Sequence, residues 1–157
     1  MTKAEVPSRT GSLAGRLEDQ RLTTGRGAFV SDHQRPGLAH ACFARSMAAC
    51  GRILALDVAK ARSLPGVIAV FTAVDLDADG IPDLLTEIDP PRDDGGSAIK
   101  TPKPFLARDR VNYLGEPLAL VVAESAALAA DAAELVGIEI AELPVVVGKE
   151  AALAPGA

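Results

Sequence analysis

The sequence predicts an α/β fold of the α+β type, with a mixed sheet built from βαβ-like units. A strand–helix–strand pattern spans residues 51–74, and a similar pattern returns at 118–142. Between them, a long irregular connection near 80–104 holds five of the eleven prolines and shows no period. Because βαβ units join parallel strands, we expect a parallel pair with the helix on one face of the sheet.

The first half of the chain supplies three strand segments. Residues 38–45 form a short apolar run between turn residues, which predicts a strand. In 51–58 apolar residues fall on both faces of an extended chain, so both faces of that strand should be covered. Asp57 is placed to cap a short helix over 58–64, and the apolar run at 67–74 predicts the next strand.

The second half repeats this order. Residues 118–123 are entirely apolar and predict a buried strand. Ser125 is placed as the N-cap of the following helix, and Gly137 should end it. Residues 138–143 then alternate apolar and polar side chains, which is typical of a half-buried strand.

Length and composition suit one soluble domain. Residues 1–15 are polar and without period, so we expect a flexible N-terminal tail followed by a domain at 16–157. Apolar residues make up 48% of the chain but aromatic residues only 3%, so packing must depend on Ala, Val, Leu and Ile.

Several functional classes are disfavoured. A net charge of −5 argues against a nucleic-acid-binding surface, which needs clustered Lys and Arg. No apolar run reaches the roughly 18 residues of a membrane span, and the N-terminus lacks the apolar core of a secretory signal. We expect a cytoplasmic protein with no membrane span.

An acidic run from Asp75 to Gly80 resembles the first half of a calcium-binding loop, with carboxylates at alternate positions. The twelfth position, which should supply a bidentate glutamate, is Thr86, and Glu87 comes one place late. The run is better explained as a helix cap or a solvated turn. A small calcium-binding protein remains an alternative.

Other motifs are weak. The stretch "TTGRGAF", which contains Arg26 and Gly27, lacks the glycine spacing of a phosphate-binding loop and favours a turn within an extended arm. His33 and His40 form no triad with a nucleophile. Cys42 and Cys50 match no zinc pattern and are predicted to be small buried hydrophobic residues.

Glu116 is the carboxylate that stands out, because it precedes a buried strand and Pro117 holds it extended. Its side chain is expected to accept backbone hydrogen bonds from a neighbouring loop. Contact with a partner's cofactor domain and direct catalysis are the alternatives. Gly115 is expected to permit close approach of the backbone in the turn that enters this strand.

Taken in order, four segments resemble a known family. They are "RLEDQRLTTGRGAFVSD", "PGLAHACFARS", "GRILALDVAKARSLPGVIAVFTAVDL" and "RDRVNYLGEPLALVVAES…DAAELVGIEIAELPVV". They are similar to the N-terminal α/β-hammerhead domain of the large subunit in the xanthine dehydrogenase/aldehyde oxidase family of molybdenum hydroxylases, especially its carbon-monoxide-dehydrogenase-like branch. The resemblance runs from about Arg16 to Ala157, and "RVNYLGEP" with the strand after it is its most specific part.

The resemblance implies a lobe or split subunit of an enzyme complex that hydroxylates its substrate with oxygen from water. In that family molybdopterin-bound molybdenum, two [2Fe-2S] clusters and FAD carry the electrons. The partners implied are therefore a molybdopterin-binding domain or subunit, an iron–sulfur subunit and a flavin subunit. The family's catalytic glutamate and cofactor loops would follow residue 157, so no catalytic, cofactor-binding or metal-binding residue is assigned to this chain.

Candidate contacts to those domains or subunits are Arg26, Gly27, Tyr113, Gly115 and Glu116. The chain departs from the family at 46–51, where "SMAACG" replaces a histidine-containing stretch. A free-standing interaction module without redox activity is the alternative function.

Overall fold

The computed structural model describes residues 16–85, 95–97 and 100–155. The chain divides into two compact units, Met1–Pro36 and Gly37–Ala157, which are described separately. The predicted tail, residues 1–15, lies outside the described residues. Among those that are described, no helix is long and apolar enough to cross a bilayer.

The first unit contains a short helix, α1 (Asp19–Thr23), and one 3-10 turn, η1 (Val30–Asp32). No residue of α1 is buried, and its ends are held by local hydrogen bonds such as that from the Arg16 amide to the Asp19 carboxylate, 2.9 Å. The extended arm predicted here is therefore interrupted by one turn of helix.

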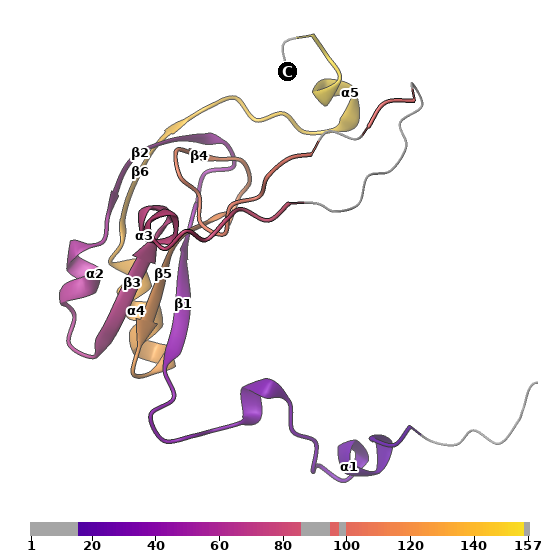
Figure 1. The fold of residues 1–157 in the computed structure, drawn as a ribbon, viewed down its shortest axis with the longest axis vertical. Coiled ribbons are helices and arrows are strands. Elements are labelled where there is room, and N and C mark those ends of the chain that lie inside the picture. The colour runs from indigo at the N-terminus through magenta and orange to yellow at the C-terminus, as the bar shows by residue number, and fades with distance from the viewer. Residues whose placement is uncertain (1–15, 86–94, 98–99, 156–157) are drawn as a thin grey trace, which may run out of the picture. The chain divides into compact units, whose positions relative to one another are not determined.

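The second unit contains two three-stranded sheets (Figure 1). The first has the order β1-β5-β3 and the second the order β4-β2-β6. The strands are β1 (His40–Arg45), β2 (Gly51–Asp57), β3 (Val67–Thr72), β4 (Arg110–Val111), β5 (Pro117–Ala123) and β6 (Gly137–Glu142). The helices are α2 (Ala59–Ser63), α3 (Ala73–Ala78), α4 (Ala126–Glu134) and α5 (Lys149–Ala152).

Every strand pair is antiparallel, so the predicted parallel pairing and single mixed sheet are wrong, although the α+β class is confirmed. The strands that flank α2, and those that flank α4, lie in different sheets. A parallel crossover generally needs a dozen or more residues, and α2 has only 5. After α4, β6 cannot pair with β5, because β1 and β3 already occupy both of its edges.

The hydrogen bonds that start the helices agree with the predictions at Ser125 and Asp57, but the end predicted at Gly137 does not. The Ser125 side chain accepts a hydrogen bond from the Leu128 amide and caps α4, as predicted. The Asp57 carboxylate accepts one from the Ala59 amide, 2.9 Å, at the start of α2. The last residue of α4 is Glu134, and Gly137 begins β6 rather than ending the helix.

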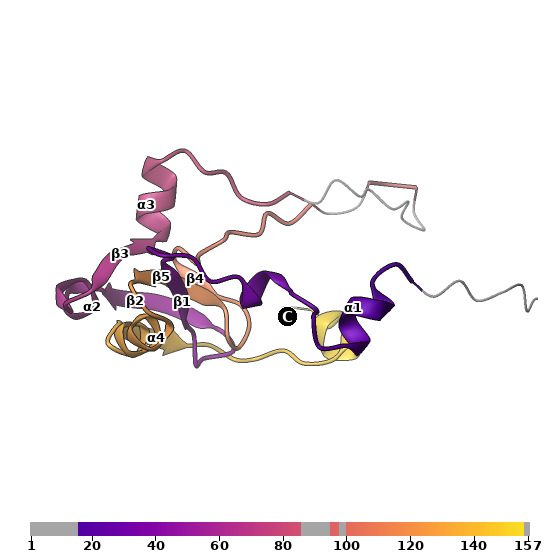
Figure 2. The same ribbon diagram turned by 90° about the horizontal axis from the view of Figure 1, so that it is seen from below.

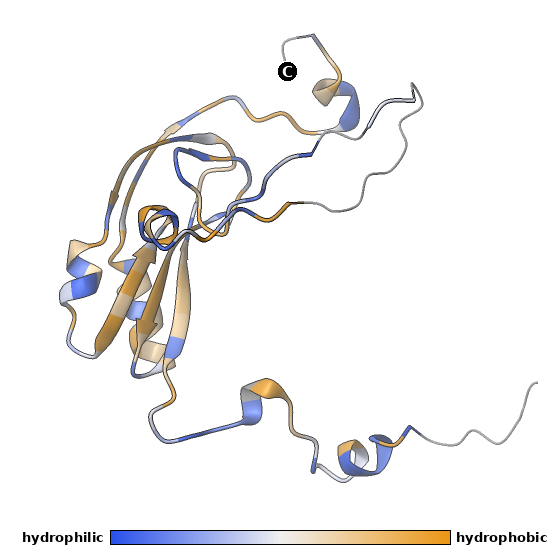
Figure 3. Cartoon of the chain, viewed as in Figure 1, coloured by the Kyte–Doolittle hydropathy of each residue, from blue (hydrophilic) through white to orange (hydrophobic). Residues whose placement is uncertain are grey.

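The core is made of small and branched aliphatic side chains. Ala119, Val121 and Ala123 of β5 are fully buried, and Ala129 and Ala132 of α4 are fully buried as well. A second cluster, around Leu118 and Val111, joins β5 to the second sheet. Figure 3 shows β3 and β5 as predominantly hydrophobic strands. The prediction that packing depends on aliphatic residues is confirmed, since no aromatic residue belongs to either core cluster.

The acidic run of the supposed calcium loop lies in and after α3. Thr72 and Asp75 form a capping box, in which the Asp75 carboxylate accepts hydrogen bonds from the Thr72 amide and hydroxyl, both 2.7 Å. These bonds, the one from the hydroxyl first, hold the pKa of Asp75 below its usual value of 3.8. The helix-cap explanation is confirmed, and the calcium loop is wrong.

The connection near 80–104 begins and ends as two paired arms. Leu84 and Lys103 form an antiparallel bridge, with N···O distances of 3.0 and 2.9 Å. Residues 86–94 and 98–99 lie outside the described part of the chain.

β3 is one of the two edge strands of the first sheet, and β1 is the other. At β3 the Arg62 guanidinium donates a hydrogen bond to the Val70 carbonyl, 2.9 Å, and lies 3.5 Å from the Asp75 carboxylate. One acceptor of the edge strand is thereby occupied by a side chain.

Leu118→Ala should lower the free energy of unfolding by about 2–5 kcal/mol, because it opens a cavity in the second core cluster. Urea unfolding followed by circular dichroism measures this loss. Leu54→Ala is the matched control, because Leu54 is 60% exposed, and it should change stability by about 0.5 kcal/mol or less. Equal losses in the two variants would contradict the assigned core.

Asp75→Asn should destabilise the domain by about 0.5–1 kcal/mol at neutral pH, as loss of a helix cap does. A carboxylate whose folded pKa is lowered stabilises above 3.8, and this contribution is lost as the pH falls through the folded pKa. The difference from the wild type should therefore shrink below pH 3.8 in urea titrations. Asp131→Asn, an exposed change on α4, is the control. A difference that is undiminished in acid would contradict this role for Asp75.

Candidate docking surface

The segment from Tyr113 to Glu116 is a tight turn that leads into β5. The Glu116 amide donates to the Tyr113 carbonyl, 3.2 Å, and Gly115 has φ +83°. A Cβ at Gly115 would meet nothing within 4 Å. The glycine is therefore required by the backbone conformation and not by crowding around a missing Cβ.

The turn is tied to the end of β1 by main-chain bonds. The Ser46 amide donates to the Glu116 carbonyl, 2.9 Å, and the Gly115 amide donates to the Ser46 carbonyl, 2.8 Å. The Arg45 guanidinium also donates to the Gly115 carbonyl, 2.9 Å. Ser46, the first residue of the stretch that departs from the family pattern, is buried and bonds locally to Ala48.

Glu116 lies beneath this turn. Its side chain is only 4% exposed, and it accepts a hydrogen bond from the Asn112 amide. The predicted structural role, acceptance of a backbone hydrogen bond from a neighbouring loop, is confirmed. The side chains that the turn presents to solvent are Tyr113 and Leu114. The Lys103 ammonium lies 5.8 Å from the centre of the Tyr113 ring.

Arg26 and Gly27 belong to the first unit. The Arg26 guanidinium bonds to the Thr24 hydroxyl, 3.2 Å, and its side chain lines a shallow hollow of about 350 Å³. A Cβ at Gly27 would lie 2.7 Å from the Leu22 Cδ2 atom, so the glycine lets that side chain fold against the backbone. The structure describes these two residues within their own unit only, and their role in contacts stays a prediction.

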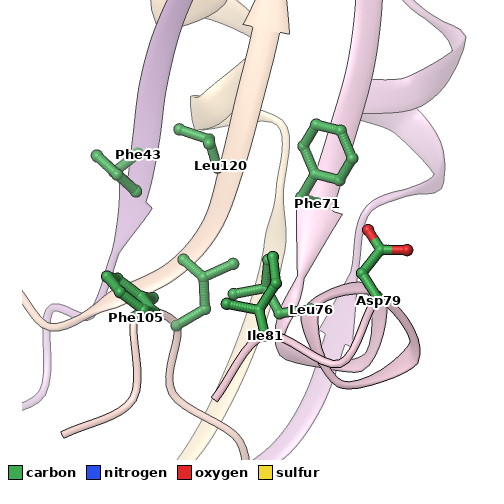
Figure 4. A pocket seen from close by; sticks show the side chains of 8 residues that line it. Phe43, Phe71, Leu76, Asp79, Ile81, Phe105 and Leu120 are labelled. Atoms are coloured by element: carbon green, nitrogen blue, oxygen red, sulfur yellow. The ribbon is translucent and has the colours of Figure 1, made fainter. Parts of the chain in front are cut away.

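An apolar groove of about 500 Å³ lies on the second unit and is absent from the sequence-based expectations (Figure 4). Its floor is a row across the first sheet, because the strand register pairs Phe43 with Leu120 and Leu120 with Phe71. One wall is Leu76 of α3 with Asp79 and Ile81, which follow the helix. The other is Phe105 and Leu106 from the opposite segment.

The groove holds much of the aromatic content of the chain. The sequence contains four phenylalanines and one tyrosine, and all five are at least partly solvent-exposed. Phe43, Phe71 and Phe105, with exposures of 41%, 36% and 46%, are gathered in the groove. The available sequence signal was the placement of Phe43 and Phe71 next to core residues, since neighbours in a strand point to opposite faces.

Arg108 links the two walls of the groove. Its guanidinium contacts the Asp77 carboxylate of α3 through Nη2, 2.7 Å, and through Nε, 3.1 Å. Through Nη1 it also contacts the Asp83 carboxylate, 2.7 Å. The hydrogen bond to Arg108 lowers the pKa of Asp77, and the bonds to Asp77 and Asp83 raise the pKa of Arg108. We refer to these three residues as the Arg108 clamp.

The described residues form no constellation for metal binding. In the part of the chain that the structure describes, no three His, Cys, Asp or Glu side chains are grouped so that they could hold an ion. Cys42 and Cys50 are half-buried rather than buried, and the Cys50 thiol lies 3.3 Å from the Arg110 guanidinium. This donor set does not fit a molybdenum centre, so we derive no chemical step through one on these residues.

Comparison with known proteins assigns the chain to a family. Residues 24–144 match the model described as "Aldehyde oxidase and xanthine dehydrogenase, a/b hammerhead domain". The nicotine 6-hydroxylase large subunit of Paenarthrobacter nicotinovorans is 44% identical over 87% of this chain and 16% of its own length. The xanthine dehydrogenase molybdenum-binding subunit of Escherichia coli O157:H7 is 36% identical over 90% of this chain and 18% of its own.

The fold is also found in a solved structure. Reconstituted CO dehydrogenase from Oligotropha carboxidovorans superposes with a TM-score of 0.77, at 37% identity, over 91% of this chain and 16% of that one. This chain thus spans less than a fifth of each of these three proteins. The family match covers well over half of the chain, in agreement with the predicted fold. The chain belongs to the aldehyde oxidase and xanthine dehydrogenase family, as its α/β-hammerhead domain.

Proposed function

We propose that this chain is the hammerhead lobe, or a split subunit, of a molybdopterin-dependent hydroxylase or dehydrogenase complex. Its role is structural: it docks to other domains or chains, which carry the catalysis. The observation that carries the proposal is the family match over residues 24–144, in a chain that spans only 16% and 18% of the two relatives described above.

The cofactors of the complex would be held by partners. One relative is named for molybdenum binding, and the family resemblance adds [2Fe-2S] clusters and FAD. The described residues of this chain present no grouped metal ligands. In such enzymes the cofactor carries the chemistry, while protein positions it and shapes access. A cytoplasmic location of the complex is part of this proposal.

The turn before β5 is one proposed contact with these partners. Tyr113 and Leu114 are exposed at its tip, while the backbone beneath them is fixed by bonds to Ser46 and Arg45. A rigid loop loses little conformational entropy when a partner binds, which favours docking. Gly115 and Glu116 would support the contact from below. Arg26 and Gly27 are proposed as a separate contact on the first unit.

Purification of the tagged chain from the organism that encodes it tests the function. We expect molybdenum, iron and flavin to accompany the chain in constant proportion, measured by inductively coupled plasma mass spectrometry and by absorption spectroscopy. A colourless protein without molybdenum would instead identify a free-standing interaction module without redox activity.

Gly115→Ala should reduce the molybdenum that accompanies the chain, because a positive φ strains any residue with a Cβ by about 1–2 kcal/mol. Gly115→Asn should lose less, since asparagine tolerates this conformation better. Gly137→Ala is the control: Gly137 is not among the positive-φ glycines, and the added Cβ would lie 3.4 Å from the Asp57 Cβ, an ordinary contact. Equal molybdenum content in all variants would exclude the turn from the contact.

A further inference from the structure

We propose that the apolar groove is the seat of one segment of the molybdopterin-binding part of the complex, an apolar segment that carries a basic side chain opposite Asp79. This inference rests on the proposed function and names the partner chemistry for a second surface. The groove lies between α3 and the segment that holds Phe105, above the strand row of Phe43, Leu120 and Phe71 (Figure 4).

The first argument is the placement of the aromatic rings. The core clusters contain only aliphatic side chains, whereas Phe43, Phe71 and Phe105 remain exposed together. Aromatic residues are enriched at the buried centres of protein interfaces and often carry most of the binding energy. A group of three in one groove is therefore a candidate interface centre rather than scattered surface residues.

The second argument is that the described elements leave this face of the sheet open. Val121 and Ala119 point to the other face, where they pack in the core cluster with Ala132 of α4. Figure 2 shows α3 and α4 on opposite sides of β3 and β5. The helix α3 borders the row of Phe43, Leu120 and Phe71 and forms a wall without covering it, since Phe43 and Phe71 stay exposed.

The third argument is that the walls are already in place. The Arg108 clamp joins α3 and Asp83 to the segment that carries Phe105 and Leu106, with N···O distances of 2.7 Å to both carboxylates. The bridge between Leu84 and Lys103 joins the same two arms further out. A preformed groove costs less ordering on binding, so more of the apolar contact appears as affinity.

The choice of occupant rests on the length of the relatives and on the charge of Asp79 in the groove. More than four fifths of the length of these two relatives has no counterpart in this chain, and one of them is named for molybdenum binding. Asp79 is the one charged residue that lines the groove, and no described residue donates a hydrogen bond to its carboxylate. A basic side chain on the occupant would pair with it, whereas an acidic one would be repelled.

A second copy of this chain is a poorer occupant. In a two-fold symmetric dimer the same patch meets itself. The interface would then bring two Asp79 carboxylates toward each other beside apolar side chains, where like charges are disfavoured. A heterologous partner with a basic side chain avoids this repulsion.

Site-specific crosslinking in the assembled complex tests the inference. Phe105 and Phe71 are each replaced by the photoreactive p-benzoylphenylalanine, and Leu54, which is 60% exposed on β2 of the other sheet, is the control position. After irradiation of the purified molybdenum-containing complex, mass spectrometry should find both groove positions attached to one segment of the molybdopterin-binding part. Adducts with a second copy of this chain, or none from the groove, would overturn the inference.

Substitutions that change charge or size in the groove give a quantitative measure of binding to the molybdenum-containing part. Phe105→Asp and Asp79→Lys should each lower the fraction of chain that is bound to molybdenum by about tenfold or more, as the loss of a central interface residue does. Leu54→Asp should leave it unchanged. Urea unfolding midpoints of the variants separate loss of binding from loss of folding, and variants that fold and bind normally would overturn the inference.

These experiments separate the two proposals. If molybdenum accompanies the chain while the groove variants bind normally, the docking lobe stands and the assignment of the groove is wrong. If no molybdenum accompanies the wild-type chain, the proposed function is wrong, and the inference that depends on it is overturned as well.

Discussion

β5 is hydrogen-bonded on both edges, by β1 on one side and by β3 on the other, and this double pairing determines where every neighbouring side chain points. Its register sets Leu120 between Phe43 and Phe71 on one face and places Ala119 and Val121 on the other. Alanines on the second face let α4 pack closely, so the core fills without rings. The aromatic side chains are left on the opposite face, where they form the groove.

The surfaces proposed for docking are held by different physical means. The turn at Gly115 depends on main-chain hydrogen bonds and on one backbone conformation that glycine adopts without strain. The groove walls depend on a forked guanidinium that reaches two carboxylates, which gives directional contacts at an exposed site. Both arrangements position exposed side chains, in line with the structural role proposed for the chain.

The sequence predicted the strands better than their partners. The fully apolar run at 118–123 marks β5 within one residue, because no polar side chain interrupts it. The pairing direction was wrong, because strand–helix–strand order alone does not show that β5 already has two neighbours. A helix cap was anticipated in the acidic run, but the start of α3 was missed. Ala73 and Val74 were assigned to the preceding strand, although the capping box between Thr72 and Asp75 marks them as the first turn of the helix.

The role of Glu116 in the turn could be predicted from local sequence, whereas the groove could not. Glu116 could be assigned from its neighbours, because its partner at Asn112 is only four residues away. The groove joins Phe43, Phe71 and Phe105 from three distant segments. Only the strand register and the Arg108 clamp bring them together, and neither is visible in local sequence.

Arg62, on α2, has a further consequence for the edge strand β3. A sheet with an open edge invites other chains to extend it, which leads to polymers. On β3 the Arg62 guanidinium occupies the Val70 carbonyl and places a positive charge where an incoming backbone would pair. This edge of the sheet therefore discourages self-association into fibres, while the face proposed for docking stays open.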